Sequence, residues 1–142
     1  MQKITRAIVG SFESVKLPAL GNMECIAKVD TGAYYGAVHV DAIEINGKGD
    51  AIATLGGKDY VFPAESVQQS RVKSASGHQS RRVVVTMPIK IQGKTYRTWI
   101  GLTRRSGMKF PMLLGRYFLR ENNILVDVKI NNHHDTDGRR LK

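Results

Sequence analysis

Short runs of apolar and β-branched residues recur along the whole chain, and glycine or small polar residues separate them. No apolar stripe at helical spacing is long enough to predict a long helix. This pattern is typical of an all-β barrel or sandwich. Two hairpins are its clearest part, because Gly56-Gly57 and Gln92-Gly93-Lys94 can adopt the positive φ angles of tight turns. The predicted strands of these hairpins are residues 51–55 with 58–62, and 83–91 with 95–102.

The remaining elements are shorter and less regular. Apolar and polar residues partly alternate in three further segments, as they do in half-buried strands. The strands predicted there are residues 7–12, 23–29 and 38–45. Near the C-terminus the pattern predicts a strand, one short helix and a strand, at residues 112–114, 117–121 and 124–128.

Residues 73–80 are small, polar and turn-forming, and strand-like residues lie on both sides of them. They predict an exposed hairpin tip. No linker, internal repeat or second domain is evident, so we expect one domain over residues 1–130. Residues 131–142 are polar and charged, and we expect this tail to fray.

The composition adds a strong positive charge. The chain has 22 Lys and Arg against 12 Asp and Glu, a formal net charge of +10, which attracts acidic partners at low salt. The basic residues are not interleaved with aromatic residues, so nucleic-acid binding rests on charge alone. Cys25 is the single cysteine, which excludes a disulfide within the chain and fits a reducing cytoplasm. The N-terminus lacks the apolar core of a signal peptide, and no later run has membrane-spanning length, which predicts a cytoplasmic protein without membrane contact.

One motif contains residues that could take part in catalysis. The strand predicted before residue 30 runs into Asp30-Thr31-Gly32, which places a carboxylate, a hydroxyl and a residue without a side chain in succession. Gly32 lets the backbone turn and leaves its N–H free to meet the carboxylate, while Thr31 can anchor the loop through its hydroxyl. An ordinary turn could contain the same three residues, so the triplet needs support from elsewhere in the chain.

That support comes from the run Met112-Leu113-Leu114-Gly115-Arg116. With it, the sequence resembles the bacterial retropepsin-like aspartic peptidase family, long labelled ATP-dependent zinc proteases and associated with ATP-grasp peptide ligases. The resemblance covers most of the chain. It implies a single-lobe, closed retropepsin-like barrel with one short helix, in which Leu113, Leu114, Gly115 and Arg116 support the active-site loop. The matching blocks are residues 29–33 with Ala37 and His39, residues 71–74 with Gly77, and residues 108–116.

The resemblance also implies catalytic machinery. Asp30, Thr31 and Gly32 would form the catalytic loop of an aspartic endopeptidase, in which two carboxylates share one proton. No second Asp-Thr-Gly exists, and Asp135-Thr136-Asp137-Gly138 lies in the tail without an apolar strand before it. A homodimer with its site on the two-fold axis is therefore implied, with an extended peptide or protein as substrate. The implied substrate-binding residues are Ala33 and Tyr34 beside the loop, and Lys73, Ser74, Ala75, Ser76 and Gly77 in a flap.

The segment after the loop departs from the family, which continues into Arg-Thr-Ser where this chain has Tyr34-Tyr35-Gly36. This tyrosine pair either lines the cleft or packs inside the barrel, and we expect it to pack. The flap is flanked by basic residues that favour an acidic substrate, and these are Arg71, Lys73, Arg81 and Arg82.

The residues support neither half of the family's older label. The four histidines, at positions 39, 78, 133 and 134, form no His-Glu-x-x-His motif, and no cysteine pair exists, so no zinc ligand set is recognisable. The chain has no glycine-rich phosphate loop for ATP. We therefore expect neither metal nor cofactor. The alternative to a peptidase is a binding or regulatory partner of an ATP-grasp ligase that adds amino acids such as glutamate to a protein tail.

Overall fold

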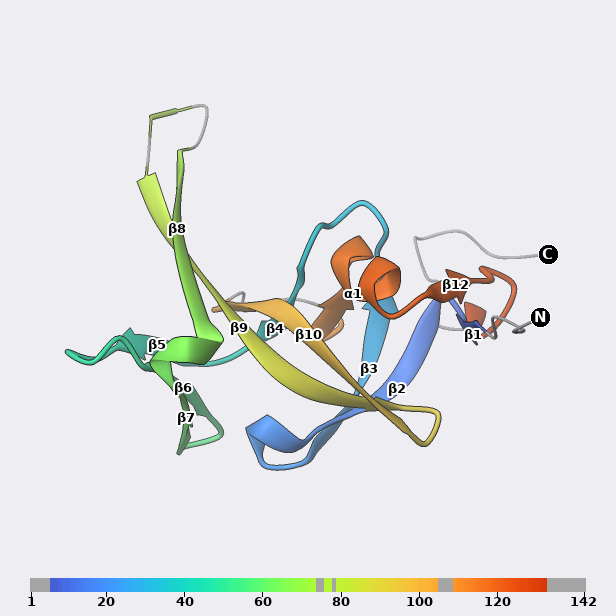
Figure 1. Cartoon of the computed structure of the whole chain (residues 1–142), viewed down its shortest axis with the longest axis horizontal. Coiled ribbons are helices and arrows are strands. Elements are labelled where there is room, and N and C mark those ends of the chain that lie inside the picture. Colours follow the sequence, from blue (N-terminus) through green and yellow to red (C-terminus); the bar gives the residue numbers. More distant parts are fainter. Residues whose placement is uncertain (1–5, 74–75, 78, 105–108, 133–142) are drawn as a thin grey trace, which may run out of the picture.

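The computed structural model describes residues 6–73, 76–77, 79–104 and 109–132. Strands make up most of this part of the chain, together with one short α-helix, α1 (Arg116–Glu121), and two single-turn 3-10 helices (Figure 1). The strands are β1 (Ala7–Val9), β2 (Phe12–Leu17), β3 (Met23–Val29), β4 (Gly36–His39), β5 (Ala42–Ile45), β6 (Ala51–Leu55), β7 (Lys58–Phe62), β8 (Val67–Lys73), β9 (Gln79–Ile91), β10 (Lys94–Thr103), β11 (Met112–Leu114) and β12 (Ile124–Val126).

Six of the strands close into a barrel. Their order is β10-β4-β11-β3-β2-β9, and β9 pairs in turn with β10. The short strand β11 lies between β3, to which it is parallel, and β4, to which it is antiparallel. The predicted all-β, single-lobe barrel with one short helix is thereby confirmed.

The barrel interior is apolar because alternate residues of each strand face inward. Strand β9 shows this period of two most clearly, since every second residue of its barrel part is at most 5% exposed; these residues are Val83, Val85, Met87, Ile89 and Ile91. Helix α1 adds Phe118 and Leu119 to the same core. Within the described residues, no helix is long and apolar enough to cross a membrane.

Strand β9 is longer than the barrel requires. Its C-terminal part pairs with β10, and its N-terminal part pairs with β8 as far as Lys73 and Gln79. The β8–β9 hairpin therefore projects beyond the barrel, at the upper left of Figure 1, and carries the predicted tip at its end. Strands β5, β6 and β7 form a separate antiparallel sheet.

The first and last strands form a small sheet of their own. Strands β1 and β12 are parallel, with Ile8 opposite Leu125. The backbone N–H of Ser11 donates to the carbonyl oxygen of Ile130, and the N–H of Val29 donates to that of Ser11, each at 2.9 Å. This terminal sheet is therefore joined directly to the end of β3, beside residue 30.

Five predicted strands differ from the observed ones. The hairpin strands predicted at residues 83–91 and 95–102 are longer, at Gln79–Ile91 and Lys94–Thr103, and β9 is extended because it continues into its pairing with β8. Segment 7–12 is divided at Gly10, where a Cβ atom would overlap the carbonyl oxygen of Ile130, so the chain passes beneath the C-terminal segment there. Segment 38–45 is divided at Asp41, whose Oδ2 accepts a hydrogen bond of 2.9 Å from the Gly56 N–H. Its first half stays in the barrel and its second half joins the other sheet. The last strand ends at Val126, not at residue 128.

Candidate active site

Asp30 is the first residue after β3 and begins the candidate catalytic loop, residues 30–35, which ends where β4 begins. Its N–H donates to the carbonyl oxygen of Leu114 at 2.8 Å, so β11 holds the start of the loop. The Asp30 Oδ1 atom accepts a hydrogen bond of 3.0 Å from the Gly32 N–H, as the triplet predicts. Asp30 is half-buried, and within the described residues its Oδ2 has no hydrogen-bond partner. One carboxylate oxygen is thus oriented and the other is available.

Gly36 and Gly115 allow two backbone segments to touch beneath this loop. Gly36 has a φ of +77°, and a Cβ there would lie 2.8 Å from the Gly115 nitrogen and would overlap the carbonyl oxygen of Leu113. A Cβ on Gly115 would lie 2.6 Å from the Gly36 nitrogen and 2.7 Å from the Tyr35 carbonyl carbon. Neither position has room for a side chain. The end of β11 is therefore pressed against the start of β4 by direct backbone contact.

The start of α1 binds four consecutive carbonyl groups of the loop. The Arg116 side chain reaches the first two, which lie 3.3 and 3.2 Å from its Nη1 atom. The backbone N–H groups of Arg116 and Tyr117 bind the other two at 2.9 and 2.8 Å. The four acceptors are the carbonyl oxygens of Thr31, Gly32, Ala33 and Tyr34.

The expected support residues meet the loop, but Thr31 acts differently from the expectation. Leu114 and Arg116 hydrogen-bond to the loop, and Leu113 and Gly115 pack against its end at Gly36. The Thr31 side chain is exposed and makes no hydrogen bond within the described residues. Anchoring of the loop within one chain therefore comes from backbone groups and the Arg116 side chain, not from the threonine hydroxyl.

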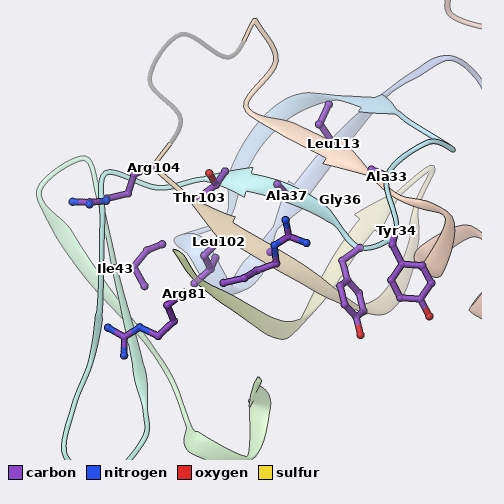
Figure 2. Close-up of a pocket in the computed structure, with 13 residues that line it drawn as sticks. Ala33, Tyr34, Gly36, Ala37, Ile43, Arg81, Leu102, Thr103, Arg104 and Leu113 are labelled. Atoms are coloured by element: carbon purple, nitrogen blue, oxygen red, sulfur yellow. The ribbon is translucent and has the colours of Figure 1, made fainter. Parts of the chain in front are cut away.

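A groove of about 620 Å³ begins beside the loop (Figure 2). It extends from the residues after the loop to the stem of the β8–β9 hairpin and the end of β10. Ala33 and Tyr34, both predicted to bind substrate, line it, whereas Asp30 does not. In a single chain the groove therefore lies next to the carboxylate and does not enclose it.

Three arginines give this groove a positively charged wall. Arg81 and Arg82 stand on the hairpin stem, and Arg104 follows β10. Figure 2 shows Arg81 and Arg104 on the side opposite Tyr34. Within the described residues none of the three pairs with a carboxylate, and Arg81 Nη1 donates to Gln69 Oε1 at 3.3 Å. An anionic group that entered the groove would be attracted to this wall.

The tyrosine pair does not pack inside the barrel, contrary to our expectation. Tyr34 is 39% exposed, and both rings line the groove. The rings of Tyr34 and Tyr35 lie 4.7 Å apart and contact Tyr117 at 5.8 and 5.4 Å. Arg120 Nη2 donates to the Tyr34 hydroxyl at 3.0 Å. The physical reason is the attachment of the loop to α1, which keeps this segment outside the barrel wall.

Tyr117 and Arg120 are site residues that the sequence motifs do not reveal. The available signal is helical spacing, since Arg116 and Arg120 are four residues apart and so share one face of α1. Burial, followed by the negative charge of Glu121, raises the pKa of Tyr117.

The predicted flap is only partly described. Lys73 ends β8, and Gly77 has a φ of +86° in a turn with open space around it. Ser76 and Gly77 are exposed, and Ser74 and Ala75 lie outside the described residues. None of the described flap residues lines the groove of this single chain, so the flap function stays a prediction.

A metal site is not assigned. In the described part of the chain, no group of three His, Cys, Asp or Glu side chains is placed to hold a metal ion. His39 Nε2 lies 3.3 Å from Asp41 Oδ1, and the buried His39 Nδ1 atom has no hydrogen-bond partner among the described residues. His78 and residues 133–142, which include the other two histidines and Asp135 to Gly138, lie outside the described residues.

The chain is similar to a solved structure and to parts of longer proteins. The crystal structure of a protein of unknown function from Legionella pneumophila matches 89% of this chain and 96% of that one, with a TM-score of 0.68 and 30% identity. Proteins named probable alpha-L-glutamate ligase from Shewanella pealeana and Desulfotalea psychrophila are 30% identical over 129 residues and 27% identical over 133 residues. These alignments cover 84% and 87% of this chain but 28% and 29% of the relatives. The chain thus spans less than a third of the length of these curated relatives.

A family model supplies the most direct comparison. The RimB-like model, described as retropepsin-like aspartic endopeptidase RimB, matches residues 8–136. That range includes the Asp30 loop, β11 and α1, which are the elements that form the site. The chain therefore belongs to the RimB-like family of retropepsin-like proteins.

Proposed function

We propose that the chain is an aspartic endopeptidase that acts as a homodimer, with the Asp30 carboxylates of two copies forming one catalytic pair. The observation that carries this proposal is the Asp30 loop itself. One carboxylate oxygen is held by the Gly32 N–H, the other is free within the described residues, and β11 and α1 fix the loop from behind. The family match supports the same assignment.

The chemistry follows from two neighbouring carboxylates. Two like charges at short distance cannot both persist, so one Asp30 is charged while the other keeps a proton. The charged carboxylate takes a proton from water as the water oxygen attacks the peptide carbonyl carbon, and the protonated one donates to the carbonyl oxygen. When the resulting diol collapses, the charged carboxylate takes back a proton from one diol hydroxyl, the carbon–nitrogen bond breaks, and the nitrogen takes a proton from the other carboxyl group, which restores the singly protonated pair. The titration belongs to the pair, which gives a bell-shaped rate profile on the acidic side of neutral.

The terminal sheet offers a face for the second copy. Ile8 and Leu125 lie opposite each other on β1 and β12 and are 49% and 47% exposed. Val128 and Ile130 follow in the same terminal segment and are 68% and 40% exposed. Clustered exposed apolar side chains favour association. Because β1 leads through Ser11 to the end of β3, a copy docked there would lie close to Asp30.

The groove favours an acidic peptide as substrate. An extended peptide can bind beside the β8–β9 hairpin with alternate side chains in pockets. The carboxylates of such a peptide would meet Arg81, Arg82 and Arg104, which have no carboxylate partner among the described residues. Peptides that differ only by Glu or Gln in the residues flanking the cleaved bond test this. The Glu peptide should be cleaved with the higher kcat/KM, and the difference should shrink as salt rises.

The dimer is tested first, by light scattering across a range of concentrations. The Asp30→Asn variant is used because it prevents self-cleavage. We expect a dimer, and we expect the unaltered protein to cleave members of a peptide library that the variant leaves intact. A persistent monomer, cleavage by the variant, or a flat pH profile would each contradict the shared carboxylate pair.

A second candidate function is binding or regulation of an ATP-grasp ligase. It is favoured by the relatives named alpha-L-glutamate ligase, in which the matching region is under a third of the chain. A binding protein should retain its affinity in the Asp30→Asn variant and lose it when Arg81 and Arg82 are replaced by Gln. A peptidase should lose cleavage in the first variant and keep a measurable rate in the second.

A further inference from the structure

The Tyr34 ring contacts two guanidinium groups. The Cζ atoms of Arg116 and Arg120 lie 5.3 and 5.7 Å from its centroid, within the range of cation–π interactions. Arg120 also donates a hydrogen bond to the Tyr34 hydroxyl. Within the described residues neither arginine pairs with a carboxylate. Tyr34 therefore contacts these arginines where a carboxylate would commonly form the ion pair.

Arg116 connects the Tyr34 ring to the candidate catalytic loop. Its Nη1 atom binds the carbonyl oxygens of Thr31 and Gly32, and the N–H of Gly32 orients the Asp30 carboxylate. A guanidinium group donates good hydrogen bonds only when its plane is oriented toward the acceptors, and contact with an aromatic ring restricts the orientation of that plane. A continuous path thus leads from the Tyr34 ring through Arg116 and Gly32 to Asp30.

We propose that Tyr34 is a positioning residue, which aims Arg116 at the loop carbonyl groups and so maintains the orientation of the Asp30 carboxylate. The effect on the loop stands independently of the proposed peptidase function, and only the effect on rate rests on it. Tyr34 therefore has a role beyond that of a groove wall.

Tyr35 provides a matched control, because it has the same side chain in the next position. Both tyrosines line the groove, and their rings are in contact. Tyr35 has no cation–π contact among the described residues. If Tyr34 only lined the groove, the two tyrosines would respond alike to substitution. If Tyr34 positions Arg116, they would respond differently.

The test compares Tyr34→Leu, Tyr34→Phe and Tyr35→Leu. An exposed cation–π contact corresponds to a roughly two- to fivefold change in rate, so loss of the Arg116 contact in Tyr34→Leu should lower kcat up to about fivefold. Tyr34→Phe keeps the ring face and should retain kcat within about twofold. Tyr35→Leu should change KM and leave kcat within about twofold. A Tyr34→Leu variant that changed KM alone, as its control does, would overturn the proposal.

Amide hydrogen exchange gives a readout that needs no catalysis. The Gly32 and Ala33 N–H groups donate to the side chain and backbone of Asp30 and report directly on the loop. In Tyr34→Leu they should exchange up to about fivefold faster, with Tyr34→Phe and Tyr35→Leu close to the unaltered protein. Unchanged exchange in Tyr34→Leu would refute the proposal even in an active enzyme. Faster exchange with no cleavage by any form would instead refute the peptidase function and leave the loop contact standing.

Discussion

Gly115→Ala is a direct test of the backbone contact that supports the candidate site. The added Cβ would lie 2.6 Å from the Gly36 nitrogen and 2.7 Å from the Tyr35 carbonyl carbon, and it would overlap the Tyr34 carbonyl oxygen. Ordinary contact begins at 3.4 Å, so the shortfall at the Gly36 nitrogen is about 0.8 Å. All these neighbours are backbone atoms, and none can rotate away.

The expected cost follows from this geometry. Overpacking a rigid site costs about 1–3 kcal/mol, and three backbone contacts place Gly115→Ala near the upper end, at about 3 kcal/mol. For a domain of this size each kcal/mol lowers the melting temperature by roughly 3 °C, so a decrease of about 10 °C is expected. The displaced atoms also belong to the segment that follows Asp30, and kcat should fall together with stability.

Urea unfolding and thermal unfolding measure the effect. The unfolding midpoint should fall while the urea dependence of the free energy of unfolding stays the same, because the native compactness is unchanged. Gly47→Ala is the control, since a Cβ at Gly47 would meet nothing within 4 Å and its backbone needs no positive φ. A loss below about 1 kcal/mol in Gly115→Ala would refute the close approach of β11 and β4.

Three further predictions concern other parts of the molecule. Glu13→Ala removes a buried acceptor shared by the side-chain amides of Gln92 and Asn131, and urea unfolding should show a loss of about 2 kcal/mol; a loss near zero would mean that water replaces the acceptor. Burial raises the pKa of Cys25 from 9.0 to about 11, so the unfolded chain loses this proton first, and stability should fall as pH rises through that window, less steeply in Cys25→Ser, where only the raised pKa of Tyr117 still contributes. Gly77→Pro cannot adopt the φ of +86° and should slow cleavage, whereas unchanged kinetics would contradict a moving flap.

The local sequence pattern was sufficient to predict the bounds of two kinds of strand. These are strands that pair with a neighbour close in sequence, and strands whose apolar run ends sharply. Strands β3, β6, β7 and β11 have the predicted bounds, since each run ends at a turn residue or at the catalytic triplet. The Gly10 break could not be predicted in this way, because its cause is contact with Ile130. The division at Asp41 has the same origin, since Asp41 becomes the acceptor of the Gly56 N–H only when β5 pairs with β6.

The same distinction between local and long-range contacts holds for the candidate site. The triplet predicted that the Gly32 N–H would meet the Asp30 carboxylate, because both groups are two residues apart in one turn. Arg104 reaches the groove only through the closure of β10 onto β4, and no local signal marks it. For Tyr34 and Tyr35 the sequence offered both the cleft and the barrel interior, and the expected packing inside the barrel is wrong because the attachment of the loop to α1 keeps both residues outside.

The departure at residues 34–36 is explained by that attachment. Gly36 enters β4 with a φ of +77° directly over the Leu113 carbonyl oxygen and the Gly115 nitrogen, a place that a side chain could occupy only if β11 moved away. The preceding Tyr34 faces Arg116 and Arg120, which lack an acidic partner among the described residues. Tyr-Tyr-Gly can therefore support the loop in two ways. Gly36 permits the close backbone contact, and the Tyr34 ring contacts the two arginines of α1. In this chain, therefore, Tyr34 and Tyr35 form part of the groove wall, and the Asp30 carboxylate accepts its hydrogen bond from the Gly32 N–H.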